Sequence, residues 1–321
     1  MKRLRNKNIG SVKTAALVAL MTMSLAVEAQ EGSTGYQFLK VPTSAHSAAL
    51  GGNNVSIIED DATLLFTNPA LITNVSDKSL SFGYTSYISS TNKLSAAFVK
   101  QVGSRGTIGA GAMLLNYGDM IETTSDFQEL GEFSASDINV QAGYTYLLTE
   151  RWTGGVQAKM LMSNYGEFKS TALGVDLGLN YYDEGRGWSI SIVGQNLGGQ
   201  VDALYEESES LPFNLVAGIT KEFENAPIRL SFTFDSMTDW DEKKLVNHMS
   251  FGADIFPSRA TWLAIGYNPR RKEEMKVAEK SKMAGLSLGG GINVKKFKVG
   301  VAYGKYHVAA SSLIINASYA F

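Results

Sequence analysis

The sequence predicts an all-β protein, a fourteen-stranded antiparallel transmembrane β-barrel with an N-terminal plug segment. Three observations lead to this prediction. Apolar and polar residues alternate with a period of two from Ser79 to Phe321, the alternating runs number fourteen, and every long link between them follows an odd-numbered run. Because successive side chains of a strand point to opposite faces, each strand has one lipid-like face and one polar or small face.

The overall composition fits this fold and excludes some kinds of chemistry. The chain has 321 residues with 32 Gly, 6 Pro and 10% aromatic residues, a balance that favours strands over helices. It has no Cys, which excludes disulfides, thiol nucleophiles and thiolate zinc sites. No window holds 18 consecutive apolar residues, so the sequence predicts no membrane-spanning helix.

The first 29 residues have the features of a signal peptide. Basic residues precede an apolar run at 15–26, and Val27-Glu28-Ala29 places small residues where a signal peptidase reads them, so we expect cleavage after Ala29. The apolar run is too short for a spanning helix, which needs about 20 residues. Cleavage removes five Lys/Arg and one Glu, which leaves 24 basic and 30 acidic groups. This acidic balance disfavours a nucleic-acid partner.

The expected strands have lengths near the 9–11 or so residues that a tilted strand needs to cross a bilayer. They span residues 79–88, 93–102, 106–117, 136–148, 151–163, 170–182, 187–197, 212–222, 227–235, 248–256, 260–267, 284–294, 297–306 and 311–321. An even number of strands is typical of single-chain bacterial outer-membrane barrels.

The lengths of the links follow their order along the chain. Every long link follows an odd-numbered strand, whereas no link after an even-numbered strand exceeds four residues. Bacterial barrels have short periplasmic turns and long extracellular loops. We therefore expect an integral protein of the cell outer membrane, with its long loops extracellular and both chain ends periplasmic.

The strand ends add further support. Aromatic residues gather near the ends of the expected strands, as in the girdles of membrane barrels. The last strand alternates and ends in Phe321, which resembles the signal that the barrel-assembly machinery of bacteria with two membranes reads.

Residues 30–78 precede the barrel and show no strand periodicity, so we expect three parts: the signal peptide 1–29, a plug or hatch at 30–78 and the barrel at 79–321. A barrel of eight strands fills its own interior, whereas fourteen strands leave a bore that a folded-back segment can occupy.

The expected plug has small and turn-forming residues at three places. Ser44 and Ala45 let the chain lie close to a wall, Gly51 and Gly52 permit a turn with positive φ, and Asn68 and Pro69 fix a bend. Asp60 and Asp61 are expected to accept backbone N–H groups or to pair with luminal Lys159. Packing is the simpler role for these residues, and a transport gate or ligand-holding role is the alternative.

The same segment carries a family resemblance. Residues 38–52 (FLKVPTSAHSAALGG), then Asp60-Asp61 and then residues 68–71 (NPAL), resemble the N-terminal signature of the PorV/PorQ family, outer-membrane barrels of the type IX secretion system. The length of the chain is closer to PorQ than to PorV. This chain has His46 where the family usually has Arg after Ser-Ala.

The resemblance implies a fold and a role. The family is related in fold to FadL-type transporters. Its PorQ members are anchors in the attachment complex, where they hold a surface partner of the PorZ type together with PorU and PorV for joining cargo to lipopolysaccharide.

No motif of an enzyme is present. The three histidines, His46, His248 and His307, lie far apart in the sequence, and nothing resembles a zinc-protease helix, a nucleophile elbow or a P-loop. We therefore expect no catalytic residues, no metal and no cofactor.

The long links have opposite charges. Link 118–135 has five acids and no base, and link 198–211 has four acids and no base, whereas link 268–283 has six bases and three acids. Either these are solvated loops near lipopolysaccharide, or charge complementarity docks a partner on them. The candidate contacts are Asp119, Glu122, Asp126, Glu206, Glu207, Arg270, Arg271 and Lys272.

We therefore expect a non-enzymatic outer-membrane anchor of the type IX attachment complex, bound by outer-membrane lipid and lipopolysaccharide. The alternative is a FadL-like channel for small hydrophobic compounds, which would need a lateral opening or a kinked plug and an apolar luminal pocket.

Overall fold

The computed structural model describes residues 36–87, 91–123, 129–202, 210–238, 244–274, 284–305 and 311–321. The expected signal peptide and the first residues of the expected plug lie outside this part of the chain.

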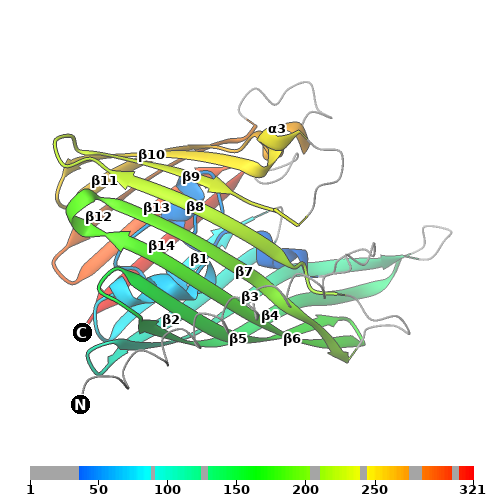
Figure 1. Cartoon of the computed structure of the whole chain (residues 1–321). Helices are drawn as coiled ribbons and strands as arrows, with labels where there is room; N and C mark the ends of the chain where they lie inside the picture. Colours follow the sequence, from blue (N-terminus) through cyan, green and yellow to red (C-terminus); the bar gives the residue numbers. More distant parts are fainter. Residues whose placement is uncertain are drawn as a thin grey trace, which may run out of the picture. The chain divides into compact units, whose positions relative to one another are not determined.

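Fourteen strands form a closed antiparallel barrel in sequence order, as the alternation predicts (Figure 1). They are β1 (Ser79–Ser86), β2 (Asn92–Val102), β3 (Gly106–Thr123), β4 (Glu129–Leu147), β5 (Trp152–Tyr165), β6 (Phe168–Asp183), β7 (Trp188–Asp202), β8 (Asn214–Glu222), β9 (Ile228–Phe234), β10 (Met249–Ser258), β11 (Thr261–Tyr267), β12 (Leu286–Val294), β13 (Phe297–Gly304) and β14 (Ser312–Ala320). The first and last strands close the barrel, with Ser79 paired to Ala320 and Ser86 to Leu313.

The wall has its apolar side chains outside and its polar side chains inside. On β1, Phe82 is 55% exposed on the outer surface, whereas Ser81 beside it is fully buried. Asn139 and Thr145 of β4 are likewise buried, although they are polar. A wall with this reversed polarity suits lipid outside and hydrogen-bonding groups inside.

The longest connections all lie at one end of the barrel, and no connection at the other end exceeds five residues. At the end with the long connections, however, only residues 166–167 join β5 to β6, where the sequence predicts a link over 164–169. Between β2 and β3 the chain turns within residues 103–105, whereas the connection from β11 to β12 spans 268–285. The C-terminal Phe321 lies at the short-turn end, where its N–H donates to the carbonyl of Lys78 at 3.2 Å.

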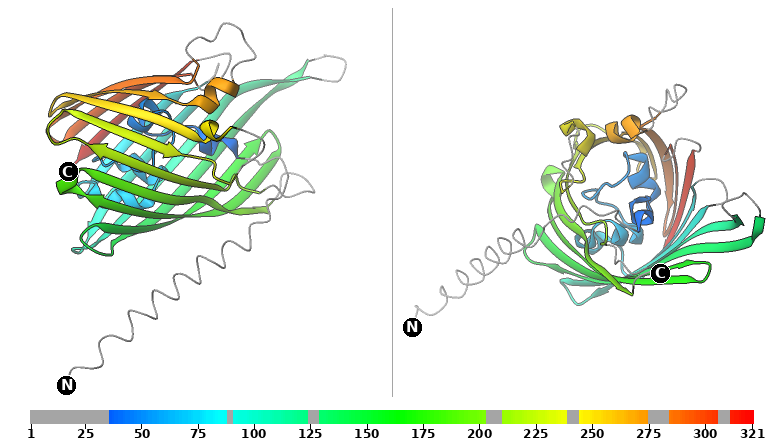
Figure 2. Two further views of the ribbon diagram at one scale, coloured as in Figure 1. Left: turned by 45° about the horizontal axis from the view of Figure 1, so that its top comes forward. Right: turned by 90° about the vertical axis from the view of Figure 1, so that its right-hand side faces the viewer.

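The predicted link 118–135 is largely strand, which corrects the sequence analysis. Strands β3 and β4 continue past Tyr117 and pair as far as Thr123 and Glu129, forming a hairpin that projects beyond the rest of the rim (Figure 2). The register shifts by one residue between Asn116 and Gly118. This bulge interrupts the period of two, because an extra residue reverses the faces of all residues after it.

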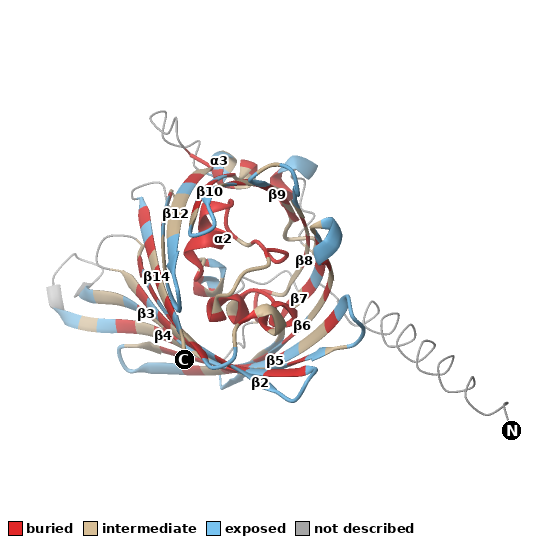
Figure 3. Cartoon of the chain, turned by 90° about the vertical axis from the view of Figure 1, so that its left-hand side faces the viewer, coloured by how far each residue is buried: buried red, intermediate tan, exposed pale blue. Residues whose placement is uncertain are grey.

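The chain from Tyr36 to Asp77, here named the inner segment, runs inside the barrel, where most of it is buried (Figure 3). It contains η1 (Gln37–Lys40), α2 (Ala45–Ala49), η2 (Ala62–Phe66) and η3 (Pro69–Asn74). Three further short helices, η4 (Glu184–Arg186), η5 (Leu245–His248) and α3 (Pro269–Glu274), lie in connections between strands.

Glycines of the barrel wall let α2 approach the strands closely. A methyl group added at Gly266 of β11 would collide with the backbone of Leu50 and Gly51, and one at Gly289 of β12 would lie 2.6 Å from the Cβ of Ala49. The small residues Ala45, Ala48 and Ala49 occupy this space. The packing therefore depends on the absence of side chains at these wall positions.

We expect Gly266→Ala to lower the free energy of unfolding by about 1–3 kcal/mol, because the added methyl overpacks the contact with the inner segment. Urea unfolding followed by the loss of heat-modifiable migration in gels measures the change. Gly199→Ala is the matched control, because nothing lies within 4 Å of a methyl at that position. Equal stabilities of the two variants would contradict this account of the packing.

Candidate functional site

The inner segment lines two cavities in the barrel. A cavity of about 400 Å³, here the long-link cavity, reaches Asn268 and Arg270 at the end with the long connections. A second of about 230 Å³, here the short-turn cavity, reaches Asn293 and Lys298 near the other end. Residues 37, 39–43, 52–53 and 66–67 line the first, and residues 45–46 and 58–61 line the second. The inner segment thus lies between the two cavities.

A buried lysine holds the start of the inner segment. Lys93 of β2 is only 1% exposed, and its Nζ donates to the carbonyl of Val41, to the carbonyl of Pro42 at 2.8 Å and to the Thr43 hydroxyl at 2.9 Å. These three oxygens satisfy all three donors of the ammonium group. This arrangement fixes residues 41–43 against the wall.

The first part of the predicted plug motif, Ser44 and Ala45, begins α2. The Ser44 hydroxyl accepts the N–H of Ser47 at 3.3 Å, which makes Ser44 the N-cap. The N–H of Ala45 donates to the Asn316 side chain of β14, which also donates to the carbonyl of Thr43 at 3.1 Å. The cap and the wall therefore position the helix together.

The second part, Gly51 and Gly52, forms the expected turn, with φ values of 104° and 125°. The carbonyl of Gly51 accepts Nδ2 of Asn268 at 3.2 Å and Nη2 of Arg271 at 2.8 Å. Glycine is needed here because side chains rarely adopt these φ values, and a methyl at Gly52 would also approach Arg271 at 2.7 Å.

The third part, Asn68 and Pro69, begins η3. Asn68 accepts the N–H of Ala70 at 2.9 Å and donates to the carbonyl of Val55 at 2.9 Å, so one side chain caps the helix and fixes the preceding loop. The hydroxyl of Thr145 donates to the carbonyl of Pro69 at 2.5 Å. Gly155 and Gly178 leave room for this bend, since a methyl at either would collide with it.

His46 lies at the centre of a buried charged cluster. Its Nδ1 lies 2.6 Å from Oε2 of Glu59, and its Nε2 lies 2.8 Å from Oδ1 of Asp254 on β10. Arg229 of β9 pairs with the other oxygen of Asp254 at 2.7 Å. The ring also stacks on Trp262, with centroids 3.7 Å apart and planes 4° from parallel.

This geometry favours the imidazolium form of His46. Burial alone would lower the pKa of His46, but the carboxylates of Glu59 and Asp254 outweigh that effect and raise its pKa. The guanidinium of Arg229 lies 3.2 Å from Nε2 and opposes the charge. With His46 protonated, the four groups have two positive and two negative charges, so the cluster is neutral.

The two predicted acids meet different partners. Asp61 accepts the N–H of Thr63 at 2.9 Å, as expected. Asp60 accepts the N–H of Ser76 at 2.6 Å and pairs with Lys298 of β13. Burial opposes ionisation of Asp60, but Lys298 and Ser76 outweigh it and hold the pKa of that carboxyl below its usual range.

The predicted pairing of Lys159 with Asp60 or Asp61 is wrong. Lys159 of β5 pairs instead with Asp176 of the neighbouring β6, at 2.7 Å. It also donates to the Asn196 side chain at 2.8 Å. Asn196 is an extra residue in β7 with a φ of 61°, and its N–H donates to Asp176 at 2.6 Å. The buried ion pair thus stabilises a bulge in the wall.

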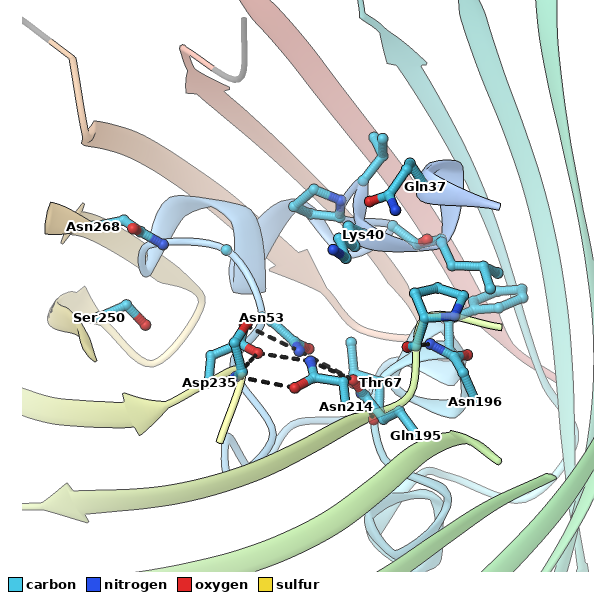
Figure 4. Close-up of a pocket in the computed structure, with 18 of the residues that line it drawn as sticks. Gln37, Lys40, Asn53, Thr67, Gln195, Asn196, Asn214, Asp235, Ser250 and Asn268 are labelled. Carbon is cyan, nitrogen blue, oxygen red and sulfur yellow. Dashed lines mark hydrogen bonds between the residues drawn. The ribbon is translucent and has the colours of Figure 1, made fainter. Parts of the chain in front are cut away.

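Side-chain amides dominate the polar lining of the long-link cavity (Figure 4). Asn53 of the inner segment donates to Gln195 of β7 at 3.2 Å, and Asn214 of β8 donates to Asp235 at 2.7 Å. Gln195 in turn donates to the carbonyl of Thr67 at 2.7 Å. Two of these bonds link the inner segment to β7, and the third joins β8 to the residue that follows β9.

The predicted charged contacts lie in different settings. Asp119 is exposed on the projecting part of β3, and Lys272 is exposed on α3. Arg270 pairs with Glu274 at 2.8 Å and donates to Ser236 at 2.7 Å. Arg271 departs from the expected exposure, because it is buried and directed at Gly51. Glu122 belongs to β3, whereas Asp126, Glu206 and Glu207 lie outside the described residues.

Sequence reasoning missed Lys93 and the partners of His46. The period of two could have identified Lys93. Leu94 and Ala96 occupy the outer face of the strand, so Lys93 has to point inward, where a lysine is unusual. Within the described residues, no cluster of three or more His, Cys, Asp or Glu side chains could hold a metal ion. None of the helices there is long and apolar enough to cross a membrane.

Comparisons with known proteins support the fold. No family model matches the chain, and no curated protein matches it either. Among solved structures, the Pseudomonas putida toluene transporter TodX is similar with a TM-score of 0.57 and 14% identity over 87% of this chain and 97% of that one. The CymD monoaromatic hydrocarbon channel has the same TM-score and identity, over 88% and 98%.

A FadL homologue from Pseudomonas aeruginosa is also similar, with a TM-score of 0.57 and 9% identity over 88% of this chain and 99% of that one. The chain therefore has a FadL-like barrel fold, which is that of an integral outer-membrane protein.

We expect the stability that His46 contributes to depend on pH with a definite sign. Its pKa is raised in the folded state, so this contribution is complete below the unfolded pKa of about 6.5 and is lost as pH rises through the folded value. Urea unfolding measures the free energy of unfolding, and a series from about pH 5 to about pH 9 covers both sides of the ordinary histidine pKa.

His46→Gln should remove this loss on raising the pH. His248→Gln, at a second buried histidine outside the cluster, should retain it. An unchanged pH dependence in His46→Gln would contradict the assignment of the imidazolium form.

Proposed function

We propose that this protein is a closed membrane-embedded anchor that holds a partner at its long-link end. One observation carries the proposal: the inner segment is hydrogen-bonded to the wall along its length. Lys93 binds its start, Arg271 and Asn268 bind the turn after α2, and Thr145 binds its last helix. A solute passing through the barrel would have to break these contacts.

The assembly that we propose for this anchor is the type IX attachment complex. The support is the resemblance of residues 38–71 to the PorV/PorQ family. Three residues of that motif have a structural role here: Ser44 and Asn68 cap helices, and Gly51 forms a turn with positive φ. The partners would be a surface protein of the PorZ type, with PorU and PorV in the same assembly. The long-link end would face outward, and lipid would cover the apolar outer wall.

Two features of the long-link end suit a docking surface. The β3–β4 hairpin projects beyond the rim and has acidic Asp119 and apolar Ile121 exposed on it. The basic helix α3 exposes Lys272 elsewhere on the same end. Opposite charges at separate places on one rim would fix the orientation of a charged partner.

The comparisons favour a second candidate, a FadL-like channel for small hydrophobic compounds. The similar structures include a toluene transporter and a monoaromatic hydrocarbon channel, which share the architecture of this chain. An apolar depression of about 540 Å³ on the outer wall, over β1–β3 and β14, would receive a hydrocarbon from the membrane. We rank this candidate second for two reasons. The long-link cavity has a polar lining, and the inner segment is hydrogen-bonded to the wall.

We expect the purified protein to give no stepwise ion conductance in planar bilayers, because the inner segment occupies the bore. A variant without residues 36–75 should conduct. The control is a variant that lacks residues 119–134, which shortens the rim and leaves the inner segment in place. Equal conductance of the full chain and the variant without the inner segment would contradict the closed barrel.

We also expect photoreactive side chains at Asp119 and Lys272 to form adducts with a surface protein in intact cells. The control is Arg259, which is exposed at the short-turn end. Adducts at all three positions alike, or at none, would contradict the anchor. Saturable binding of decanoate by the solubilised protein, without any adduct, would favour the channel.

A further inference from the structure

We propose that the long-link cavity is a binding site for a neutral, hydroxyl-rich ligand of saccharide size. This site goes beyond the anchor role, because it lies inside the barrel and does not depend on the rim. The cavity volume of about 400 Å³ lies within the range of about 300–1,000 Å³ that is usual for small-molecule sites.

One wall of the cavity consists of three carboxamides and one carboxylate that hydrogen-bond to one another. Asn214 donates to Oδ1 of Asp235 at 2.7 Å, and Asn53 lies 3.4 Å from its Oδ2 and 3.2 Å from Gln195. The four side chains come from the inner segment, β7, β8 and the end of β9, and Figure 4 shows them gathered at one side of the cavity. Such a group is preorganised, since its members orient one another.

This wall presents donors and acceptors side by side. A carboxamide has both a carbonyl acceptor and two N–H donors, and an ionised carboxylate only accepts. A ligand hydroxyl can donate to one group and accept from another, because its hydrogen rotates to suit the partner. Adjacent hydroxyls of a sugar ring therefore match a wall of carboxamides with one carboxylate.

Another side chain of the lining has a hydrogen-bond acceptor without a partner among the described residues. Asn139 of β4 lines the cavity and is buried, and its Nδ2 donates to Gln141 at 3.0 Å. Its Oδ1 accepts no hydrogen bond in the described structure. A buried acceptor without a partner is unfavourable, and a donor from a ligand, directly or through a water molecule, would satisfy it. The half-buried ring of Phe66 borders the same space and adds an apolar contact for sugar C–H groups.

Other classes of ligand fit less well. A hydrocarbon would offer no partner to the donors and acceptors that the amides and Asp235 do not already use on one another. An anion would find Lys159 already paired with Asp176, Arg270 with Glu274, and Arg271 donating to the carbonyl of Gly51. The other lysine of the lining, Lys40, is exposed to solvent. An extended peptide would need a free strand edge, and each of the fourteen strands of the closed barrel already has two neighbours.

Isothermal titration of the full-length protein in detergent with maltose and with sucrose tests the proposal. We expect saturable binding of at least one sugar with a dissociation constant on the order of 1 mM, the affinity of a few hydrogen bonds in a wet site. Asn214→Leu should weaken binding at least about tenfold, which is about 1.4 kcal/mol. Asn293→Leu is the matched control, because Asn293 is an amide that lines the other cavity, the short-turn cavity. Sugar binding by this variant should be unchanged.

Heat-modifiable migration in gels confirms that each variant is folded. If Asn214→Leu does not fold, Asn53→Leu replaces it, and the same weakening is expected. No saturable heat with either sugar, or equal weakening in the Asn293 control, would overturn the proposal. These outcomes leave the anchor role untouched, because that role is tested by adducts at the rim.

Discussion

The close fit of the inner segment into the barrel is the contact on which the rest of the structure depends. Fourteen strands enclose more space than their own inward side chains fill. Glycines leave room for the inner segment because they have no side chains. Gly266 and Gly289 lie where α2 approaches the wall, and Gly155 and Gly178 lie where η3 approaches it. Because a side chain at any of these four positions would collide with the inner segment, the segment and the wall fit each other closely.

Polarity adds a second constraint, since the inside of this barrel is where its charges are buried. The ammonium of Lys93 has only neutral oxygens around it, whereas His46 and Arg229 have the carboxylates of Glu59 and Asp254. A buried charge is tolerated when it is paired and hydrogen-bonded. Lys93 joins the inner segment to β2, and the pair of His46 with Asp254 joins it to β10, so the polar interior orients the segment while the glycines make room for it. Both constraints hold the inner segment inside the barrel.

The sequence predicts the barrel well because a period of two is a local property of each strand. Fourteen runs could be counted from it, and the two glycines of the turn after α2 could be recognised from their conformational freedom. The continuation of β3 and β4 was missed because one extra residue at Tyr117 reverses the pattern. The partner of Lys159 and the inward direction of Arg271 depend on strand register and on contacts over more than two hundred residues, which a single sequence does not specify.

Hydrogen–deuterium exchange of the full-length protein in lipid nanodiscs tests the central claim most directly, because it reports whether the inner segment is docked in the absence of any ligand. The account predicts that amides of residues 44–52 and 62–74 exchange as slowly as those of the strands they contact, β11 and β12, and much more slowly than those of the short turn at 103–105. Exchange of the inner segment at the rate of that turn would contradict it.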